Sequence, residues 1–512
     1  MRTLLARFAL TIAFAVAAAA PSALRAQASA YVPLDDVAYS YVDALMARGA
    51  LKDLSALERP YTRRELLAAI DSTRPSLSGE RMLSWLDALE RTIGKYEVAA
   101  DSDSAALHTR FSGDLYATAQ SSGRRELMLA DDRNSVEPGM TIRMVMEGGP
   151  VAASIRGLID NRLNQDPEFA GRKDRKIAGR TEDGYGSAQW KYGEVFVGRL
   201  GRNWGPSALT GLQLGNYAYT YDHLYGRIGT RAFHISTVLA RLDDDKLQSG
   251  ATVQRYFSIH RLAMHRGAWD AAASESFVYT GVGRGFEPSL SNPFNLYSLS
   301  WRNERADGNL ALGLETSWRS ARLGILSAQL LLDDVQIDKC DTICNEPSSY
   351  GLTVSAEGLP LRGDHRAFVS YTRVSNLTYR TPNYSERYAI FNVGLGRGFS
   401  DYDELRGGVD LALSRYAPVK IYVAFRRQGE GDYRTQFPLV SAYPTTPVTF
   451  SGTVMNVARV GVSSGGRFRS FEFSGDAGFN HASNFAHMAG VTQSAFEGRV
   501  KLSWIPSAHL DF

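Results

Sequence analysis

Apolar and polar positions alternate along most of the chain after about residue 100. Near the C-terminus, Phe496, Val500 and Trp504 lie on one face of an extended strand, and Glu497 and Lys501 lie on the other. A period of two is that of a β-strand with one apolar and one polar face. Either a soluble sheet or a membrane barrel gives this alternation, because the apolar face packs on a core in the first and meets lipid in the second.

The same alternation recurs in residues 107–116, 151–160, 421–426 and 471–480, separated by breaks rich in Gly, Asp and Asn. Charged residues return on the face opposite the apolar one, which a water-filled lumen permits and a dry sandwich core does not. No fixed-period repeat is evident, which argues against a propeller or a β-helix. At about 22 to 26 residues for each strand and its turn, roughly 410 residues give about 16 to 18 strands, and an even number is expected. The pattern predicts an all-β transmembrane barrel over residues 100–512, with about 18 antiparallel strands.

Residues 31–97 have a helical period instead. Val37, Tyr41 and Leu45 recur at helical spacing, and the segments 63–70 and 80–93 read as further helices. Thr62 followed by Glu65 three residues later matches a capping box (residues 62–65), which marks a helix start. The segment 32–51 resembles an S-layer-homology module, a fold that elsewhere binds cell-wall polymers. A periplasmic helical cap packed on the barrel is the alternative interpretation of this small N-terminal α-helical domain.

The N-terminus is typical of an export signal. Arg2 and Arg7 form a basic start, the apolar run Phe8–Ala20 follows, and small residues surround Ala28. A membrane anchor is disfavoured because a spanning helix needs about 20 apolar residues. We therefore expect a cleaved signal peptide at residues 1–28, a periplasmic helical domain and a barrel in the outer membrane.

Charge changes little in this picture. The formal net charge of +3 falls to zero when Arg2, Arg7 and Arg25 are removed with the signal, so the pI of 8.6 is no evidence for nucleic-acid binding.

Past the signal, no apolar run approaches 18 residues, which excludes a helical membrane protein. Trp301, Trp318 and Trp504 are expected to include girdle residues at the membrane interface.

The two cysteines, Cys340 and Cys344, lie in a polar segment. In an oxidising compartment they are expected to form a local disulfide across a loop, and free thiols are the alternative. No His stands near them in sequence, and no segment has the spaced oxygen ligands of a calcium loop, so we expect no metal site and no cofactor.

Motifs of catalysis are missing from the sequence. It has no G-x-S-x-G elbow, H-E-x-x-H, P-loop or G-x-G-x-x-G opening a helix. His234 and His260 each have a serine two residues away, Ser236 and Ser258, but neighbours on one strand do not make a triad. We expect a protein that is not an enzyme.

Four segments in order resemble the capsule-assembly outer-membrane protein family, Wzi. They are VGRLGRNWGPSALTGLQLGNYA (197–218), RYFSIHRLAMH (255–265) with SNPFNLYSLSW, LSAQLLLDDVQID (326–338) with SYGLTVSAEG, and SYTRVSNLTYRTPNYSERY (370–388) with LGRGFSDYDELRGGVDLAL. The resemblance implies a barrel of about 18 strands with a helical domain on the periplasmic side. It also implies a lectin-like role in binding and assembling or anchoring capsular or extracellular polysaccharide. The alternative is an outer-membrane porin or substrate-specific diffusion channel.

The expected partners follow from this reading. They are an acidic capsular polysaccharide or exopolysaccharide, outer-membrane lipid and the barrel-assembly machinery, with no nucleic acid. A monomer is compatible with the sequence, which does not fix the oligomeric state.

Candidate contacts for an acidic polysaccharide are Arg199, Arg202 and Trp204, together with His260 and Arg261. Arginine forks pair with uronate carboxylates, and an indole face stacks on the apolar side of a sugar ring. In the alternative interpretation, Trp204 shapes a turn with the following Gly and Pro. The arginines and His260 are then partners of acidic residues inside the lumen.

Overall fold

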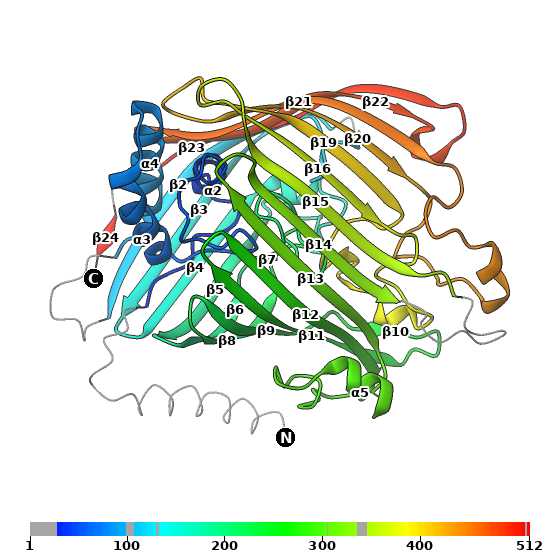
Figure 1. Cartoon of the computed structure of the whole chain (residues 1–512). Coiled ribbons are helices and arrows are strands. Elements are labelled where there is room, and N and C mark those ends of the chain that lie inside the picture. Colours follow the sequence, from blue (N-terminus) through cyan, green and yellow to red (C-terminus); the bar gives the residue numbers. More distant parts are fainter. Residues whose placement is uncertain are drawn as a thin grey trace.

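The computed structural model describes residues 28–98, 107–129, 133–304, 306–334, 346–506 and 509–511. These residues form a closed antiparallel β-barrel with a small helical region at one end (Figure 1). The main sheet has 20 strands, of which β10 (Asp245–Lys246) and β24 (Leu510–Asp511) are two-residue extensions. The other 18 form the barrel, and the pairing of β2 with β23 closes it. The predicted fold class is confirmed.

The barrel strands follow one another around the wall in chain order. Their bounds are β2 (His108–Gln120), β3 (Ser135–Gly148), β4 (Val151–Asp160), β5 (Gly179–Trp190), β6 (Gly193–Arg199), β8 (Asp222–Gly229), β9 (Phe233–Arg241), β11 (Thr252–Arg266), β12 (Trp269–Val282), β13 (Asn309–Ser320), β14 (Gly324–Asp334), β15 (Ser349–Pro360), β16 (Arg366–Val374), β19 (Tyr402–Leu411), β20 (Val419–Gln428), β21 (Met455–Phe468), β22 (Phe471–Ser483) and β23 (Thr492–Trp504).

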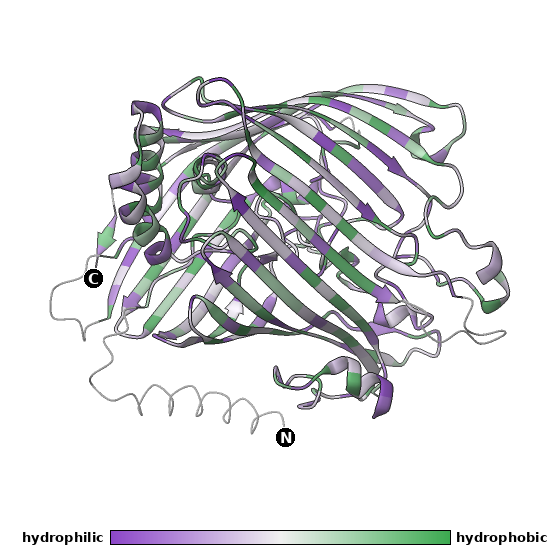
Figure 2. Cartoon of the chain, viewed as in Figure 1, coloured by the Kyte–Doolittle hydropathy of each residue, from purple (hydrophilic) through white to green (hydrophobic). Residues whose placement is uncertain are grey.

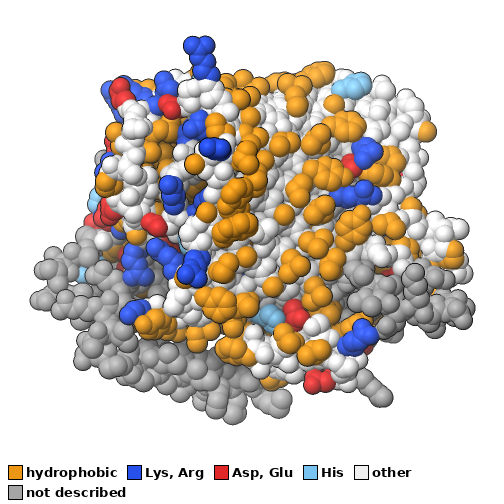
Figure 3. Space-filling view, in the orientation of Figure 1, with side chains coloured by type: hydrophobic (Ala, Val, Ile, Leu, Met, Phe, Trp, Pro, Cys, Tyr) orange, Lys and Arg blue, Asp and Glu red, His pale blue; other side chains and the backbone are white. Residues whose placement is uncertain are grey.

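Side chains alternate between the two faces of this wall, as the sequence pattern predicts. On β23, Phe496, Val500 and Trp504 point outward and are exposed, whereas Glu497 points inward and is buried. The bands of opposite hydropathy along each strand in Figure 2 show the same period. Hydrophobic side chains spread over the outer wall in Figure 3, while charged side chains gather near the helical region. The outer wall is therefore apolar, as contact with lipid requires.

The two ends of the barrel differ in their connections. At one end the turns are short, as between β3 and β4 (149–150) or β21 and β22 (469–470). At the other end the connections are long, among them 200–221, 375–401 and 429–454. Among the described residues, no helix is long and apolar enough to cross a membrane.

Three helices cover the short-turn end: α2 (Ala38–Met46), α3 (Arg63–Thr73) and α4 (Glu80–Ile93). The predicted capping box is present at the start of α3, where the side chains of Thr62 and Glu65 each accept the other's backbone N–H. The helices dock through polar contacts: Trp85 Nε1 donates to the Ser414 carbonyl at 2.9 Å. Arg48 and Asp410, both nearly buried, form an ion pair at 2.9 Å.

Segments that enter from both ends of the barrel fill its interior. The strand β1 (Glu58–Arg59) pairs with β7 (Asn203–Trp204), which belongs to the long connection 200–221. A second long connection adds the hairpin of β17 (Ala389–Ile390) and β18 (Val393–Gly394). These segments pack with inward-facing wall residues in one buried cluster rich in tyrosine. The lumen is therefore occupied by protein along much of its length.

Candidate functional site

A groove at the long-connection end combines arginines, carboxylates and aromatic rings. We call it the outer groove; it encloses about 370 Å³. The ends of β5, β6, β8 and β9 form one side, and the connections 161–178, 200–221 and 375–401 form the other. Its principal lining residues are Glu168, Phe169, Arg180, Arg199, Tyr219, Tyr221, Asp222, Arg241, Asp243 and Phe391.

Arg199 is the predicted residue that reaches this groove. Its guanidinium pairs with Asp222 at 2.7 Å, and about 29% of its side chain is exposed, compared with 70% for Asp222. A second bond runs from Arg199 to the Thr181 carbonyl at 3.2 Å. Such a half-exposed ion pair in water contributes little to stability, so its groups remain open to exchange with a ligand.

Aromatic rings line the same groove beside the cations. The guanidinium of Arg180 lies 4.7 Å from the ring centre of Tyr219, and Phe169 meets that ring edge-on at 5.4 Å. Phe391 is 54% exposed, and its backbone N–H donates to Asp243 at 2.7 Å. Rings, forked donors and carboxylate acceptors together suit the apolar faces, carboxylates and hydroxyls of sugars.

Two further cavities continue inward from this groove. A middle cavity of about 210 Å³ shares Tyr219, Thr220 and Tyr221 with the groove. An inner pocket of about 360 Å³ follows at the short-turn end, and Arg202 lines both. The outer groove, the middle cavity and the inner pocket follow one another along β5, β6 and β8. Arg202 lies at the boundary between the middle cavity and the inner pocket.

Arg202 itself is buried in an aromatic box. Its guanidinium lies 3.6 Å from the ring centre of Tyr225, 4.7 Å from Phe196 and 5.3 Å from Tyr31. Its Nε donates to Nε2 of His223 at 2.9 Å. A desolvated cation–π contact is worth about 2 kcal/mol, so Arg202 stabilises the packing of Tyr31 against the wall residues Phe196 and Tyr225.

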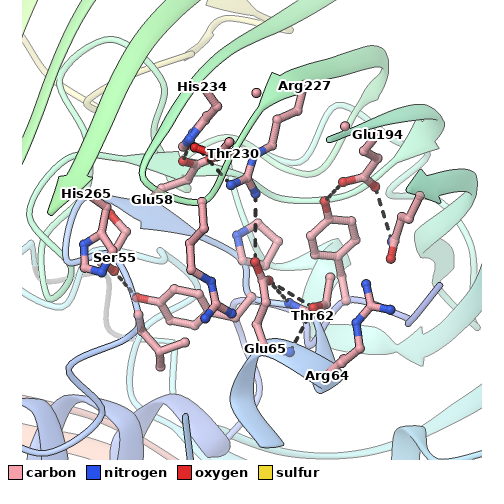
Figure 4. Close-up of a pocket in the computed structure, with 18 of the residues that line it drawn as sticks. Ser55, Glu58, Thr62, Arg64, Glu65, Glu194, Arg227, Thr230, His234 and His265 are labelled. Carbon is pink, nitrogen blue, oxygen red and sulfur yellow. Dashed lines mark hydrogen bonds and ion pairs between the residues drawn. The ribbon is translucent and has the colours of Figure 1, made fainter. Parts of the chain in front are cut away.

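The inner pocket lies between the helical region and the barrel (Figure 4). Arg64 and Glu65 come from the start of α3, and Arg227 and His234 come from β8 and β9. His234 Nε2 lies 3.0 Å from Oε2 of Glu58. Burial alone would raise the pKa of the Glu58 carboxyl, but the nearby His234, Arg261 and Arg227 hold it well below its usual range. Glu58 therefore remains a fixed anion at this boundary.

Trp204 and Arg261 belong to the same boundary. Trp204 is 1% exposed and pairs with Glu58 across the β1–β7 ladder. Arg261, also 1% exposed, donates to Glu315 at 2.7 Å and to Glu58 at 3.2 Å. These positions agree with the structural interpretation of both residues, and their role in polysaccharide binding stays a prediction.

The side chain of His260 points outward from the barrel wall and not into the lumen. It lies on the face of β11 that also carries the exposed Leu262 and Met264, and it pairs with Glu275 at 3.3 Å. The acidic partner expected from the sequence is present, but the predicted lumen location is wrong. Successive residues of a strand point to opposite faces of the wall, so an offset of one residue exchanges the lumen face for the outward face. A contact between His260 and polysaccharide stays a prediction.

Cys340 and Cys344 lie outside the described residues, so their disulfide stays a prediction. No group of three His, Cys, Asp or Glu side chains within the described ranges is arranged to hold a metal ion.

Most residues of the outer groove were not predicted from the sequence. Tyr217, Tyr219 and Tyr221 repeat at a spacing of two just before β8, and this aromatic repeat was an available signal. Phe391 had none, because it enters the groove from a connection about 170 residues further along the chain.

Among comparisons with known proteins, only those with solved structures find matches. No protein-family model matches the chain, and none of the curated proteins matches it. Among solved structures, it is similar to Wzi, an outer-membrane protein involved in group 1 capsule assembly in Escherichia coli and described as a carbohydrate-binding β-barrel. The TM-score is 0.65 at 11% sequence identity, over 94% of this chain and 100% of that one. OpdK of Pseudomonas aeruginosa gives 0.43 at 12% identity, over 80% and 99%.

The likeness to Wzi supports an outer-membrane barrel with a Wzi-like fold. At 11% identity it does not extend to membership of that family, which stays a prediction.

Proposed function

We propose that this protein binds acidic capsular or extracellular polysaccharide at the outer groove and helps to assemble or anchor it at the cell surface, without catalysis. The observation that supports this most is the meeting of Arg199, Arg180 and Arg241 with Tyr219 and the exposed Phe391 in one groove. Arginine recognises uronate carboxylates by paired hydrogen bonds, and aromatic rings stack on sugar faces. The carbohydrate-binding barrel of similar fold adds to the case by analogy.

The orientation in the membrane follows from the connections. Outer-membrane barrels have short periplasmic turns and longer extracellular loops. The outer groove is built from the long connections, so we place it at the cell surface, and the helices at the short-turn end then face the periplasm.

Retention of the purified barrel on immobilised polymer tests the groove. Alginate serves as the uronate probe and dextran as the neutral one. Arg199→Ala should weaken retention on alginate, because a charge-assisted hydrogen bond is worth roughly 1.5–3 kcal/mol when desolvated and less at a wet rim. Phe391→Ala should weaken it with less dependence on salt, since stacking has a large apolar component. Added salt should weaken wild-type binding, because exposed ion pairs are screened.

Arg322→Ala is the matched control, since Arg322 is an exposed arginine in a turn at the opposite end of the barrel. All variants should keep the heat-modifiable gel shift of a folded barrel. Unchanged retention of folded Arg199→Ala and Phe391→Ala on alginate would remove the outer groove from the proposal.

The diffusion channel remains the second candidate, and conductance in planar bilayers separates it from the first. A lumen occupied by β1, β7 and the β17–β18 hairpin should pass little current. Large, steady single-channel currents from the wild type would favour the channel.

A further inference from the structure

An ionisable pair sits on the lipid-facing side of the barrel wall. His260 on β11 and Glu275 on β12 are direct partners across the strands. On the same outward face, Leu262 lies two residues along β11, and Leu314 on β13 is exposed. A charged group at this depth is costly unless protein covers it and supplies partners.

The connection between β12 and β13 supplies that cover. We call residues 283–304 the flap; it contains α5 (Tyr297–Asn303). The Tyr297 N–H and the Ser298 hydroxyl each donate to Glu275 at 2.6 Å. The ring of Tyr297 lies 4.3 Å from that of His260. Glu275 is therefore a latch that holds the flap against the outside of the barrel.

The underside of the flap is sealed by apolar contacts. Leu290 and Tyr297 pack in one buried cluster with Phe277 and Tyr279, which lie on the outward face of β12. Backbone that leaves a strand at membrane depth is tolerated only where protein covers its polar groups, and this cluster does so on the inner side.

The other side of the flap exposes large apolar side chains, with the charged Arg302 and Glu304 at its C-terminal end. Phe286, Phe294, Leu296, Leu299 and Trp301 are each between 47% and 67% exposed. Because Tyr297 contacts the wall at His260, the flap lies over the same outward face that carries the exposed Leu314. Aromatic and aliphatic side chains in this position are typical of segments that lie in the interface of a membrane.

We propose that the flap is embedded in the outer leaflet of the membrane, with its exposed apolar side chains among lipid acyl chains and the Glu275 latch holding it there. The partner is thus a lipid surface. This use of the flap is separate from polysaccharide binding at the outer groove, because the groove is formed at the ends of β5, β6, β8 and β9, whereas the flap packs on β12.

Spin labels on single cysteines test the proposal in vesicles of phosphatidylethanolamine and phosphatidylglycerol. The background replaces Cys340 and Cys344 by Ser. A nitroxide on Leu299→Cys should collide with dissolved oxygen and not with a water-soluble nickel complex. Leu314→Cys on the outer wall is the lipid reference, and Leu439→Cys, where Leu439 is 76% exposed on a long connection, is the water reference.

A Leu299 label that collides with nickel as the Leu439 label does would overturn the proposal. A label shielded from both reagents would also overturn it, because a second protein surface would then cover the flap. Adding Glu275→Gln should raise the nickel collision rate at Leu299 several-fold, since a neutral amide holds the Tyr297 and Ser298 donors less firmly. An unchanged rate in that variant would show that Glu275 is not the latch.

Discussion

Arg261 ties the segment between α2 and α3 to the barrel wall. It lies on the inner face of β11 and donates to Glu315 on β13 at 2.7 Å. It also donates to Glu58 of β1 at 3.2 Å and to the Leu57 carbonyl at 3.2 Å. One buried guanidinium therefore joins two wall strands to the segment that connects α2 and α3.

We expect Arg261→Met to lower the free energy of unfolding by about 3–5 kcal/mol, the usual cost of removing one partner of a buried ion pair. The substitution keeps much of the side-chain volume, so the main effect is on charge. Glu315, which is fully buried, keeps Gln329 as a donor at 2.9 Å. Glu58 keeps His234.

Guanidinium unfolding in lipid vesicles, followed by tryptophan fluorescence, measures the change. Adding Glu315→Gln to Arg261→Met should recover part of the loss, because it removes the uncompensated charge, and the double-mutant cycle should show coupling of about 0.5–3 kcal/mol. Proteolysis within residues 51–62 should become faster in the single variant. Arg322→Ala, at an exposed turn, should stay within about 0.5 kcal/mol of the wild type.

A free energy of unfolding of Arg261→Met within about 1 kcal/mol of the wild-type value, with residues 51–62 still protected, would refute this role of Arg261. That result would mean that Glu58 and Glu315 find other partners or water.

Two further perturbations test the occupied interior. In Gly211→Ala, the new Cβ would lie 2.0 Å from the Trp204 carbonyl oxygen and 2.4 Å from that of Leu214, so the 200–221 connection should be displaced and planar-bilayer conductance should rise. Glu386, in a long connection, has a pKa that burial raises to about 7, and its carboxyl accepts from Asn383 at 2.7 Å. Because the folded-state pKa is raised, its stabilisation is complete below the ordinary pKa of 4.5 and is lost as pH rises through about 7. The melting temperature should fall over that interval in the wild type but not in Glu386→Gln, and equal pH profiles would contradict this.

The elements themselves were largely predictable from local pattern. Helix α4 spans the predicted residues Glu80–Ile93, and the capping box at Thr62 begins α3 where expected. The alternation on β23 correctly gave one apolar and one charged face. These features depend on side chains within a few residues of one another, and the periods of 3.6 and 2 record them directly.

Tertiary structure alone decided what each face meets. His260 and Arg261 are neighbours in sequence, yet His260 lies on the outward face of the wall under the flap and Arg261 joins β1 in the interior. The outer groove likewise gathers Arg199 and Phe391 from distant parts of the chain. The alternation assigns side chains to two faces but does not say which long connection folds inward, which lies on the outer wall and which borders the groove. Those outcomes depend on contacts between segments far apart in sequence, whose energies no local pattern contains.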